Sequence, residues 1–324
     1  MRVLAGFQPS GKFHLGNYFG SILPNINHQK SSKQSYFIVA DLHSLTSMSD
    51  PKLLHEYALD NVLDFLACGF EPDHSVLFRQ SAVPEHTELF WILSTICPMG
   101  LMERAVSFKE KVERGIDASV GLFTYPILQA ADILLYDAEK IPVGKDQKQH
   151  IEMTRDIAMK FNHRFGETFT IPEPVIQESV AVVPGLDGQK MSKSYGNTIP
   201  LFGDEKSIKK AIMSIVTDSK DVSEPKDPGS CIVYQIHKLF LAPAEQKTLA
   251  DKYRAGGMGY GDAKKMLLEA YLDFFAPMRK NREELLKNPS YVEEVLRDGA
   301  AKAKAVAAKK MQKVRLAVGL QASL

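Results

Sequence analysis

Two lysines in a short glycine-flanked segment are the residues of this chain whose spacing first suggests chemistry. The segment DGQKMSKSYGN, residues 187–197, holds Lys190 and Lys193 between Gly188 and Gly196. A flexible loop with two ammonium groups can close over a polyanion that binds and leaves. A solvated surface turn is the alternative, and the rest of the chain has to decide between them.

A histidine and an asparagine near the start of the chain form a second candidate site. In FQPSGKFHLGNYFG, residues 7–20, His14 and Asn17 are three positions apart and share one face of a helix. Gly16 allows close approach to the backbone, and the free N–H groups of a helix N-terminus bind anions. The pattern predicts a phosphate site, with a packed histidine in an N-terminal turn as the alternative.

The segment PVGKDQKQH, residues 142–150, forms a third candidate. Gly144 leaves room for a planar ring or a sugar against the backbone. Asp146 and Gln147 open a helix, where an acidic residue suits the helix dipole and can accept hydrogen bonds from hydroxyl groups. Plain helix capping is the alternative.

Short apolar strands that alternate with amphipathic helices position these segments. Asp50 and Pro51 are typical of a helix start, and Gly69 of a helix end. This order predicts a parallel, doubly wound sheet with right-handed crossovers, which binds ligands at the carboxyl ends of its strands. The expected strands cover residues 2–7, 35–40, 75–80 and 140–144, and the expected helices cover about 51–68, 84–96 and 146–165.

The pattern changes after about residue 200, where the chain becomes helical and charge-rich, with a glycine-rich break at 254–262. The predicted fold class is therefore α/β, a Rossmann-like doubly wound parallel sheet with a smaller C-terminal helical domain. The expected parts are a catalytic domain over 1–186, a mobile loop over 187–200, a helical domain over 201–290 and a basic terminal helix over 291–324 that can pack back on the first domain.

The composition narrows the classes of protein. The chain has 324 residues, 44% of them hydrophobic and 24% charged, which suits a folded protein of about two domains. A formal net charge of +1 means that a nucleic-acid partner has to be held by a local basic patch. The three cysteines form no CxxC pair, so we expect no structural zinc or iron–sulfur site and a reducing cytosol. We expect no signal peptide, and no apolar run reaches the roughly 18 residues of a membrane span.

Taken together, the three candidate segments resemble a class I aminoacyl-tRNA synthetase. HLGN at 14–17 corresponds to the HIGH signature of that family, and KMSKS at 190–194 matches its second signature in full. With GLFTYPILQAADILLY at 121–136 and PVGKDQKQH at 142–150, the chain is similar to bacterial tryptophanyl-tRNA synthetases over most of its length.

The resemblance implies the chemistry of an ATP-dependent ligase. The amino-acid carboxylate attacks the α-phosphorus of ATP, pyrophosphate leaves, and the adenylate then gives its amino acid to tRNA(Trp) with release of AMP. Mg²⁺ accompanies the ATP phosphates, and no tightly bound metal or organic cofactor is implied. Positioning and charge stabilisation dominate such chemistry. Lys190 and Lys193 meet the leaving pyrophosphate, and His14 and Asn17 contact phosphate.

The resemblance also implies a set of nucleotide-binding residues, with the backbone near Val183 against adenine and Lys111 as a weaker addition. This set is Gln8, Pro9, Ser10, Gly16, Asn17, Gly144, Lys145, Asp146, Val183, Lys190, Met191, Ser192, Lys193 and Ser194.

Asp132 is the residue that suggests which amino acid is used. It lies in an apolar helical stretch, where an unpaired carboxylate would be costly. The indole N–H of tryptophan can only donate, so a buried carboxylate that accepts it would orient and select that side chain. An internal cap or ion pair is the alternative. The resemblance places Asp132 at the indole nitrogen, Tyr125 and Gln147 near the ammonium group, and His43, Gln129, Ile141, Val143 and Leu4 in the pocket wall.

Three residues depart from the family pattern. Gln129 stands where methionine usually faces the indole, Leu4 where an aromatic residue is often found, and Lys145 where an acidic residue is usual. A polar Gln129 predicts altered packing, a bridging water or weaker affinity for tryptophan, and it leaves the ATP residues untouched.

The C-terminal segment AKAKAVAAKKMQKVRLAVG, residues 301–319, is basic, and no acidic residue follows Asp298. Such a helix suits phosphate contacts, and a solvated face over inward-packed Val306, Met311 and Val314 is the alternative. The resemblance implies that tRNA spans a cytoplasmic homodimer and that helical parts, here 201–290, read its anticodon. The basic residues are Lys302, Lys304, Lys309, Lys310, Lys313 and Arg315.

Three other functions remain open from the sequence. A tyrosine-specific relative shares the fold and also uses an aspartate at the side-chain end. A small nucleotidylyltransferase has an HxGH-like helix, but such chains are usually shorter and lack a helical tail. A non-catalytic paralogue that only binds tryptophan or RNA is disfavoured by the intact pair Lys190 and Lys193.

Overall fold

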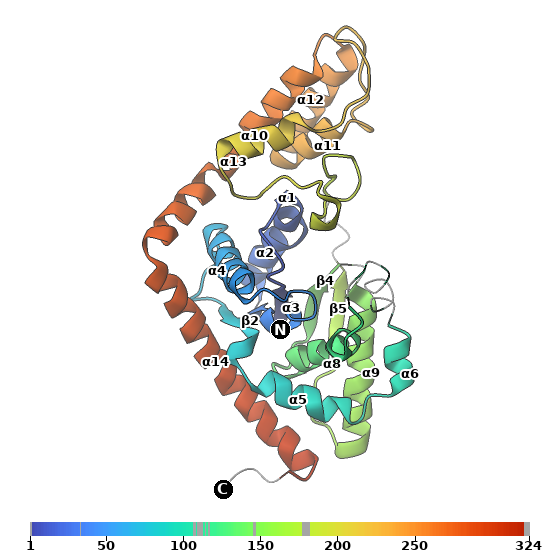
Figure 1. Ribbon diagram of the computed structural model, residues 1–324, viewed down its shortest axis with the longest axis vertical. Helices are drawn as coiled ribbons and strands as arrows, with labels where there is room; N and C mark the ends of the chain where they lie inside the picture. Colours follow the sequence, from blue (N-terminus) through green and yellow to red (C-terminus); the bar gives the residue numbers. More distant parts are fainter. Residues whose placement is uncertain are drawn as a thin grey trace.

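A computed structural model describes residues 2–320 apart from 33, 106–107, 109–112, 114, 116, 145–146 and 177–181. Within these residues a parallel sheet of five strands has the order β3-β2-β1-β4-β5 (Figure 1). The order reverses between β1 and β4, as in a doubly wound Rossmann-like sheet. The predicted fold class is confirmed. The strands are β1 Arg2–Phe7, β2 Gln34–Val39, β3 Val76–Arg79, β4 Lys140–Val143 and β5 Glu173–Ile176.

The strand β5 is the element of the sheet that the sequence did not predict. It carries Pro174 and follows Pro172, and proline within a short apolar run argues against a strand. The structure places β5 at the end of the strand order, where one side of the strand has no ladder partner among the described residues. A proline without an N–H is tolerated at such an edge.

Both faces of the sheet are buried, which produces two hydrophobic cores. Along β2, Tyr36 and Ile38 join one core, and Phe37 and Val39 join the other. This alternation follows from the period of two in a strand. The core that holds Phe37 and Val39 extends into the helical C-terminal part. The core that holds Tyr36 and Ile38 includes residues of α5 Glu85–Ser94, α8 Val120–Leu134, α9 Lys148–Phe165 and α14 Pro289–Ala317.

The helices of the sheet region begin and end close to where the sequence places them. Asp50 caps the helix after β2, because its carboxylate accepts from the backbone N–H groups of Lys52 and Leu53 at 2.8 and 3.1 Å. The elements are α1 Leu15–Asn17, the π-helical turn η1 Tyr18–Ile22, α2 Leu23–Ser31, α3 Asp41–Ser44, α4 Pro51–Ala67, η2 Gln80–Ala82, α5 Glu85–Ser94, α6 Met99–Glu103, α8 Val120–Leu134, α9 Lys148–Phe165 and η4 Lys193–Tyr195.

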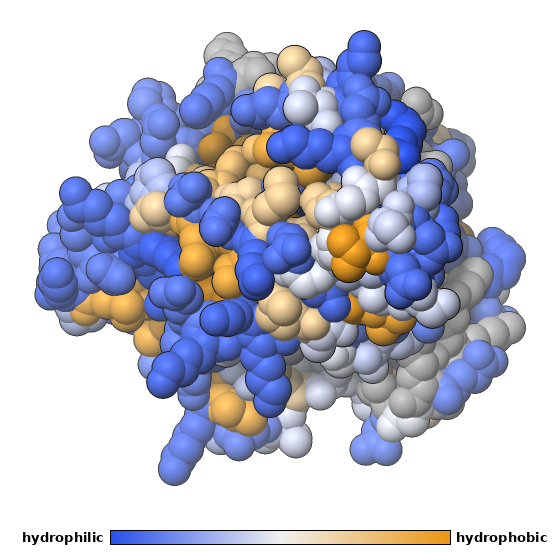
Figure 2. Space-filling view, turned by 90° about the horizontal axis from the view of Figure 1, so that it is seen from above, coloured by the Kyte–Doolittle hydropathy of each residue, from blue (hydrophilic) through white to orange (hydrophobic). Residues whose placement is uncertain are grey.

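The part of the chain after η4 is mainly helical, as expected. In Figure 1, α10, α11, α12 and the start of α13 form the upper end of the molecule, and α14 descends to the lower end. The glycine-rich break separates two helices at Gly256 and Gly257, whose φ angles of +75° and +81° suit glycine. Seen from this end, the surface is mostly hydrophilic, with apolar residues in separate patches (Figure 2). The elements are α10 Glu205–Met213, α11 Ile232–His237, η5 Lys238–Phe240, α12 Pro243–Ala255, α13 Tyr260–Lys287 and α14 Pro289–Ala317.

The last helix, α14, runs back along the sheet region and packs on β3 (Figure 1). The contact is so close that a Cβ atom on Gly299 would lie 1.8 Å from the carbonyl oxygen of Leu77. A glycine is therefore required at this crossing. No helix of the described residues is long and apolar enough to cross a lipid bilayer.

Two of the basic residues of α14 serve this packing. The ammonium group of Lys310 is buried and lies 2.6 Å from Asp137 Oδ1, and Arg315 Nε lies 2.7 Å from Glu88 Oε1. Met311 and Val314 are buried as the alternative reading of this helix requires. Within the basic segment 301–319, the cations that are exposed to a phosphate partner are Lys302, Lys304, Lys309 and Lys313.

Candidate active site

The site lies where β1 and β4 end side by side. In a doubly wound sheet, the crevice for ligands opens at the point where the strand order reverses. Here the turn after Phe7 and the exposed Gly144 after Val143 meet at that point. Lys145 and Asp146, and also Lys111, lie outside the described residues.

The HLGN segment forms the start of the first helix. His14 is the N-cap of α1, and its backbone N–H donates to Asn17 Oδ1 at 3.0 Å. The chain then continues through η1 into α2. Residues 199–201 pair with this start, because Leu15 N donates to Ile199 O at 2.9 Å and Leu201 N donates to Phe13 O at 3.0 Å. This pairing brings the lysine loop to the first helix.

The KMSKS segment is docked on the HLGN helix. Met191 is buried, and the backbone N–H of Gly16 lies 3.3 Å from its sulfur. Lys193 Nζ donates to the carbonyl oxygen of Gly11 at 2.8 Å, which places one ammonium group at the turn after β1. The Lys190 side chain is exposed. The two elements that the sequence pairs are therefore adjacent in space.

A buried asparagine holds the backbone of this loop. Asn197 Oδ1 accepts from Ser192 N at 2.8 Å, and its Nδ2 donates to Asp187 Oδ1 at 2.7 Å and to Lys190 O at 3.3 Å. A Cβ atom on Gly185 would lie 2.2 Å from the same Nδ2. The sequence analysis did not predict a role for Asn197, although it is the last residue of the lysine-containing segment 187–197.

Burial makes the electrostatics of this corner sensitive to an anion. Burial, with the charge of Lys193 added, lowers the pKa of His14 to about 4, so the imidazole is neutral at pH 7 and would meet a phosphate as an N–H donor. Its Nδ1 is buried without a hydrogen-bond partner among the described atoms. Burial also lowers the pKa of Lys193 to about 8. A bound polyanion would favour the charged lysine.

The other residues expected to bind nucleotide surround the same turn. Gln8 Nε2 donates to His43 O at 3.1 Å, and Ser10 N donates to Gln8 O at 2.8 Å. Pro9 is buried and Ser10 is exposed. The carbonyl oxygen of Val183 accepts from Met191 N at 2.9 Å, which fixes Val183 beside the loop. Ser192 Oγ accepts from Ser194 N at 3.3 Å.

The residues expected to bind tryptophan lie on one face of α8, within β1 and β4, and in the segments that follow β2 and β4. Tyr125, Gln129 and Asp132 are spaced by four and three positions, which puts them on one helical face. The ring of His43 lies edge-on to Tyr125 at 6.1 Å, and Tyr125 OH lies 2.9 Å from His150 Nε2. Leu4 and Ile141 are buried in the sheet, Val143 is half-buried, and Gln147 N donates to Gly144 O at 3.0 Å.

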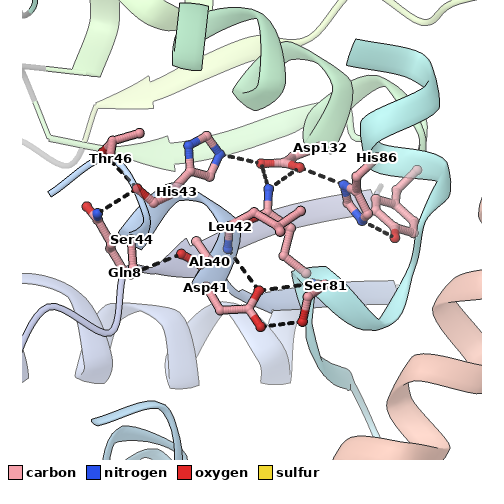
Figure 3. A network of polar contacts seen from close by, with 12 residues as sticks. Gln8, Ala40, Asp41, Leu42, His43, Ser44, Thr46, Ser81, His86 and Asp132 are labelled. Atoms are coloured by element: carbon pink, nitrogen blue, oxygen red, sulfur yellow. Dashed lines mark hydrogen bonds and ion pairs between the residues drawn. The ribbon is translucent and has the colours of Figure 1, made fainter. Parts of the chain in front are cut away.

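Asp132 is buried, as the sequence predicts, but it is not unsatisfied. Its carboxylate lies 2.8 Å from His43 Nε2 and 2.6 Å from His86 Nδ1, and Gln80 Nε2 donates to both of its oxygens at 2.7 and 2.9 Å (Figure 3). The protein itself therefore supplies donors to this carboxylate, as the alternative of an internal ion pair requires, and the bond to an indole N–H stays a prediction. Burial alone would raise the pKa of Asp132, but the two histidines outweigh it and hold the pKa at about 2.

Gln80, His86 and Tyr136 are site residues that the sequence reasoning missed. Gln80 directly follows β3, and the rule that strand ends carry ligand groups would have found it. His86 lies on α5, and its Nε2 is 2.9 Å from Tyr136 OH. No local spacing links Gln80 or His86 to Asp132, because both approach it across the fold. Tyr136 lies only four positions after Asp132.

Comparisons with known proteins agree with this geometry. The family model described as class I tRNA synthetases for W and Y matches residues 1–276. The chain belongs to that family. The predicted family membership is confirmed.

A separate observation concerns metal ions. No cluster of three or more His, Cys, Asp or Glu residues suited to a metal ion occurs in the described part of the chain.

Relatives and solved structures of this synthetase family match the chain along nearly its whole length. The tryptophan–tRNA ligase of Fusobacterium nucleatum subsp. nucleatum is 52% identical over 320 residues, which is 98% of each chain. That of Rhodopirellula baltica is 51% identical over 321 residues, 99% of this chain and 100% of the relative. The structure of tryptophanyl-tRNA synthetase from Campylobacter jejuni complexed with ADP and tryptophan has a TM-score of 0.94 at 50% identity, and covers 99% of this chain and 100% of that one.

Proposed function

We propose that the chain activates L-tryptophan with ATP to tryptophanyl-adenylate and transfers it to tRNA(Trp), with release of pyrophosphate and AMP. The docking of the KMSKS loop on the HLGN helix carries this proposal, because it brings the Lys193 ammonium group to the turn after β1. Relatives about half identical over nearly the full length are named tryptophan–tRNA ligases, and a solved relative holds ADP and tryptophan.

The nucleotide is proposed to lie between these two elements. Lys190 and Lys193 stabilise the negative charge of the departing pyrophosphate, and His14 and Asn17 donate to phosphate oxygens. Charged donors aimed at developing negative charge are the largest single source of stabilisation in such reactions. Mg²⁺, held by the phosphates, supplies further neutralisation. The proposed binding residues are Gln8, Pro9, Ser10, Gly16, Gly144, Lys145, Asp146, Val183, Met191, Ser192 and Ser194.

The amino acid is proposed to lie against α8, with its indole N–H at Asp132. The ionised carboxylate can only accept, and the indole nitrogen can only donate, so the pair is complementary. Tyr125 and Gln147 hold the ammonium group. Leu4, Ile141, Val143, His43 and Gln129 form the wall, and the half-buried Gln129 makes that wall more polar than a hydrocarbon side chain would.

The remaining parts are proposed to serve tRNA and assembly. Residues 1–186 act as the catalytic domain, 187–200 as a mobile loop, 201–290 as the helical tRNA-recognition domain and 291–324 as a basic helix. A cytoplasmic homodimer that shares one tRNA fits the exposure of Trp91 on α5, whose side chain is 68% exposed, and of Met99 on α6 at 63%. Sedimentation of a Trp91→Glu variant as monomer would support that interface.

The direct test is amino-acid-dependent exchange of labelled pyrophosphate into ATP across the standard amino acids. Tryptophan is expected to drive exchange and tyrosine is not. Lys193→Ala should lower the exchange rate by about 10²-fold or more while tryptophan still binds. Exchange driven by tyrosine alone would refute the proposal, and unchanged turnover in Lys193→Ala would remove the role given to the loop.

A further inference from the structure

The carboxylate of Asp132 lies between His43 on one side and His86 on the other (Figure 3), and the two sides differ in exposure to solvent. Gln80 and His86 are 0% exposed, whereas the side chain of His43 is 13% exposed. Oδ1 receives Gln80 and His86, and Oδ2 receives His43 together with the longer branch from Gln80. Oδ1 is therefore held by two fully buried side chains, Gln80 and His86. Oδ2 is the oxygen bonded by His43, the partly exposed side chain.

The interior side has a defined direction of donation. An ionised carboxylate accepts only, so the His86 Nδ1 that lies 2.6 Å from Oδ1 must carry the proton. The other ring nitrogen, Nε2, lies 2.9 Å from Tyr136 OH. This second bond to Tyr136 holds the ring of His86 in the orientation in which Nδ1 donates to Asp132.

Gln80 is used in a one-sided way. Its Nε2 bridges both oxygens of Asp132, but its Oε1 is buried without a hydrogen-bond partner among the described atoms. Leaving a buried acceptor unpaired is unfavourable, and such groups in native structures need an explanation. Fold stability alone does not favour a glutamine at position 80. The donation from its side-chain nitrogen to Asp132 does favour a glutamine there.

We propose that Gln80 and His86 are positioning residues for indole recognition, which hold Asp132 so that Oδ2 faces the indole N–H. His43, the accessible partner, shares or yields Oδ2 when the indole binds. This inference rests on the proposed activation of tryptophan. It assigns the selectivity for the N–H group to three residues from three elements, η2, α5 and α8.

The test compares L-tryptophan with β-(3-benzothienyl)-L-alanine, which has sulfur in place of the N–H group. The ratio of their kcat/KM values in pyrophosphate exchange reports the bond to Asp132. The Gln80→Met variant keeps the side-chain length and removes the donor. In Gln80→Met we expect the ratio to fall about tenfold, because the hydrogen bond between the charged Asp132 and the indole N–H loses its alignment. The loss should appear in KM for tryptophan, with kcat at saturation little changed.

A matched control is available in α2. Gln29 is also buried, at 4% exposure, and its side-chain amide bonds the backbone of Glu71 at 2.7 and 3.3 Å. Gln29→Met should lower thermal stability and leave the ratio unchanged. If Gln80→Met does not fold, Tyr136→Phe removes a single oxygen and should still lower the ratio about threefold through His86.

The outcomes separate this inference from the proposed function. No exchange with tryptophan in the unmodified protein would defeat the function itself. Exchange with tryptophan and a ratio near one would defeat the bond between Asp132 and the indole. A high ratio that stays unchanged in both folded variants, or that falls equally in Gln29→Met, would overturn the positioning role of Gln80 and His86.

Discussion

Replacing Asn197 with alanine should slow adenylate formation without weakening tryptophan binding. The Asn197 side chain is 3% exposed and bonds the loop at three points, Ser192 N, Lys190 O and Asp187 Oδ1. These three bonds fix the backbone on both sides of Lys190 and immediately before Lys193. The variant keeps both lysines but removes the side chain that fixes their spacing.

The size of the effect follows from the three lost bonds. Each hydrogen bond contributes about 0.5–1.5 kcal/mol net, and water can replace part of each one at the loop surface. The loop would still be held by buried Met191 and by the contact of Lys193 with Gly11. We therefore expect a loss of about 1–3 kcal/mol in transition-state stabilisation, which corresponds to a roughly 5- to 150-fold lower kcat.

Single-turnover adenylate formation, with tryptophan affinity measured by calorimetry without ATP, checks this prediction. Asn162 provides the control, because it is also buried and organises a loop, accepting from Thr168 N at 3.1 Å and Phe169 N at 2.9 Å. Asn162→Ala should lower stability with little change in kcat. An unchanged kcat in folded Asn197→Ala, or an equal loss in both variants, would refute the reasoning.

Three further perturbations test the electrostatics and packing. Because burial lowers the pKa of Lys193 to about 8 and the charged form is required, kcat/KM for ATP should fall about tenfold per pH unit above that value, and Lys193→Arg should abolish this alkaline decline. Arg282→Ala should lower the free energy of unfolding by about 3 kcal/mol at pH 8 in urea titrations, because it leaves the carboxylate of Asp64 buried without the Arg282 Nε at 2.6 Å. The loss should be smaller at pH 6, because burial raises the pKa of Asp64 to about 7 even against Arg282, so the variant can protonate it. Gly299→Ala should lower Tm in thermal denaturation, although alanine normally favours a helix by about 1 kcal/mol, because its Cβ would lie 1.8 Å from Leu77 O.

The parts of the fold that the sequence predicts are those determined by residues close together in the chain. The cap of α4 at Asp50, the glycine break at 256–257 and the alternation along β2 each depend on residues a few positions apart. The sequence did not predict β5, a run of only four residues with Pro174 at its second position, which lies at the end of the strand order. Edge position is a property of the whole sheet and has no local signal.

The candidate site divides in the same way. Segments such as HLGN and KMSKS are contiguous, so their spacing alone indicated an anion site. The network around Asp132 joins residues 46, 52 and 89 positions apart in sequence, and it was predicted only as an unidentified ion pair or ligand contact. For the basic terminal helix the sequence left phosphate contact and inward packing both open, because composition cannot tell that Lys310 pairs with Asp137.

The strand ends also explain how the two proposed subsites, for nucleotide and for amino acid, can share one edge of the sheet and still respond separately. Gln8, His43 and Gln80 follow β1, β2 and β3, and His43 touches both sides, with its carbonyl oxygen on Gln8 and its ring on Asp132. The carbonyl belongs to α3, whose start is fixed by Asp41 through Ser81 N at 2.9 Å. A ring can rotate about its side-chain bonds while its backbone stays in place. The ring of His43 can therefore adjust to the amino acid without moving the turn that faces the lysine loop. For this reason, a substitution in that loop is expected to change kcat and not the affinity for tryptophan.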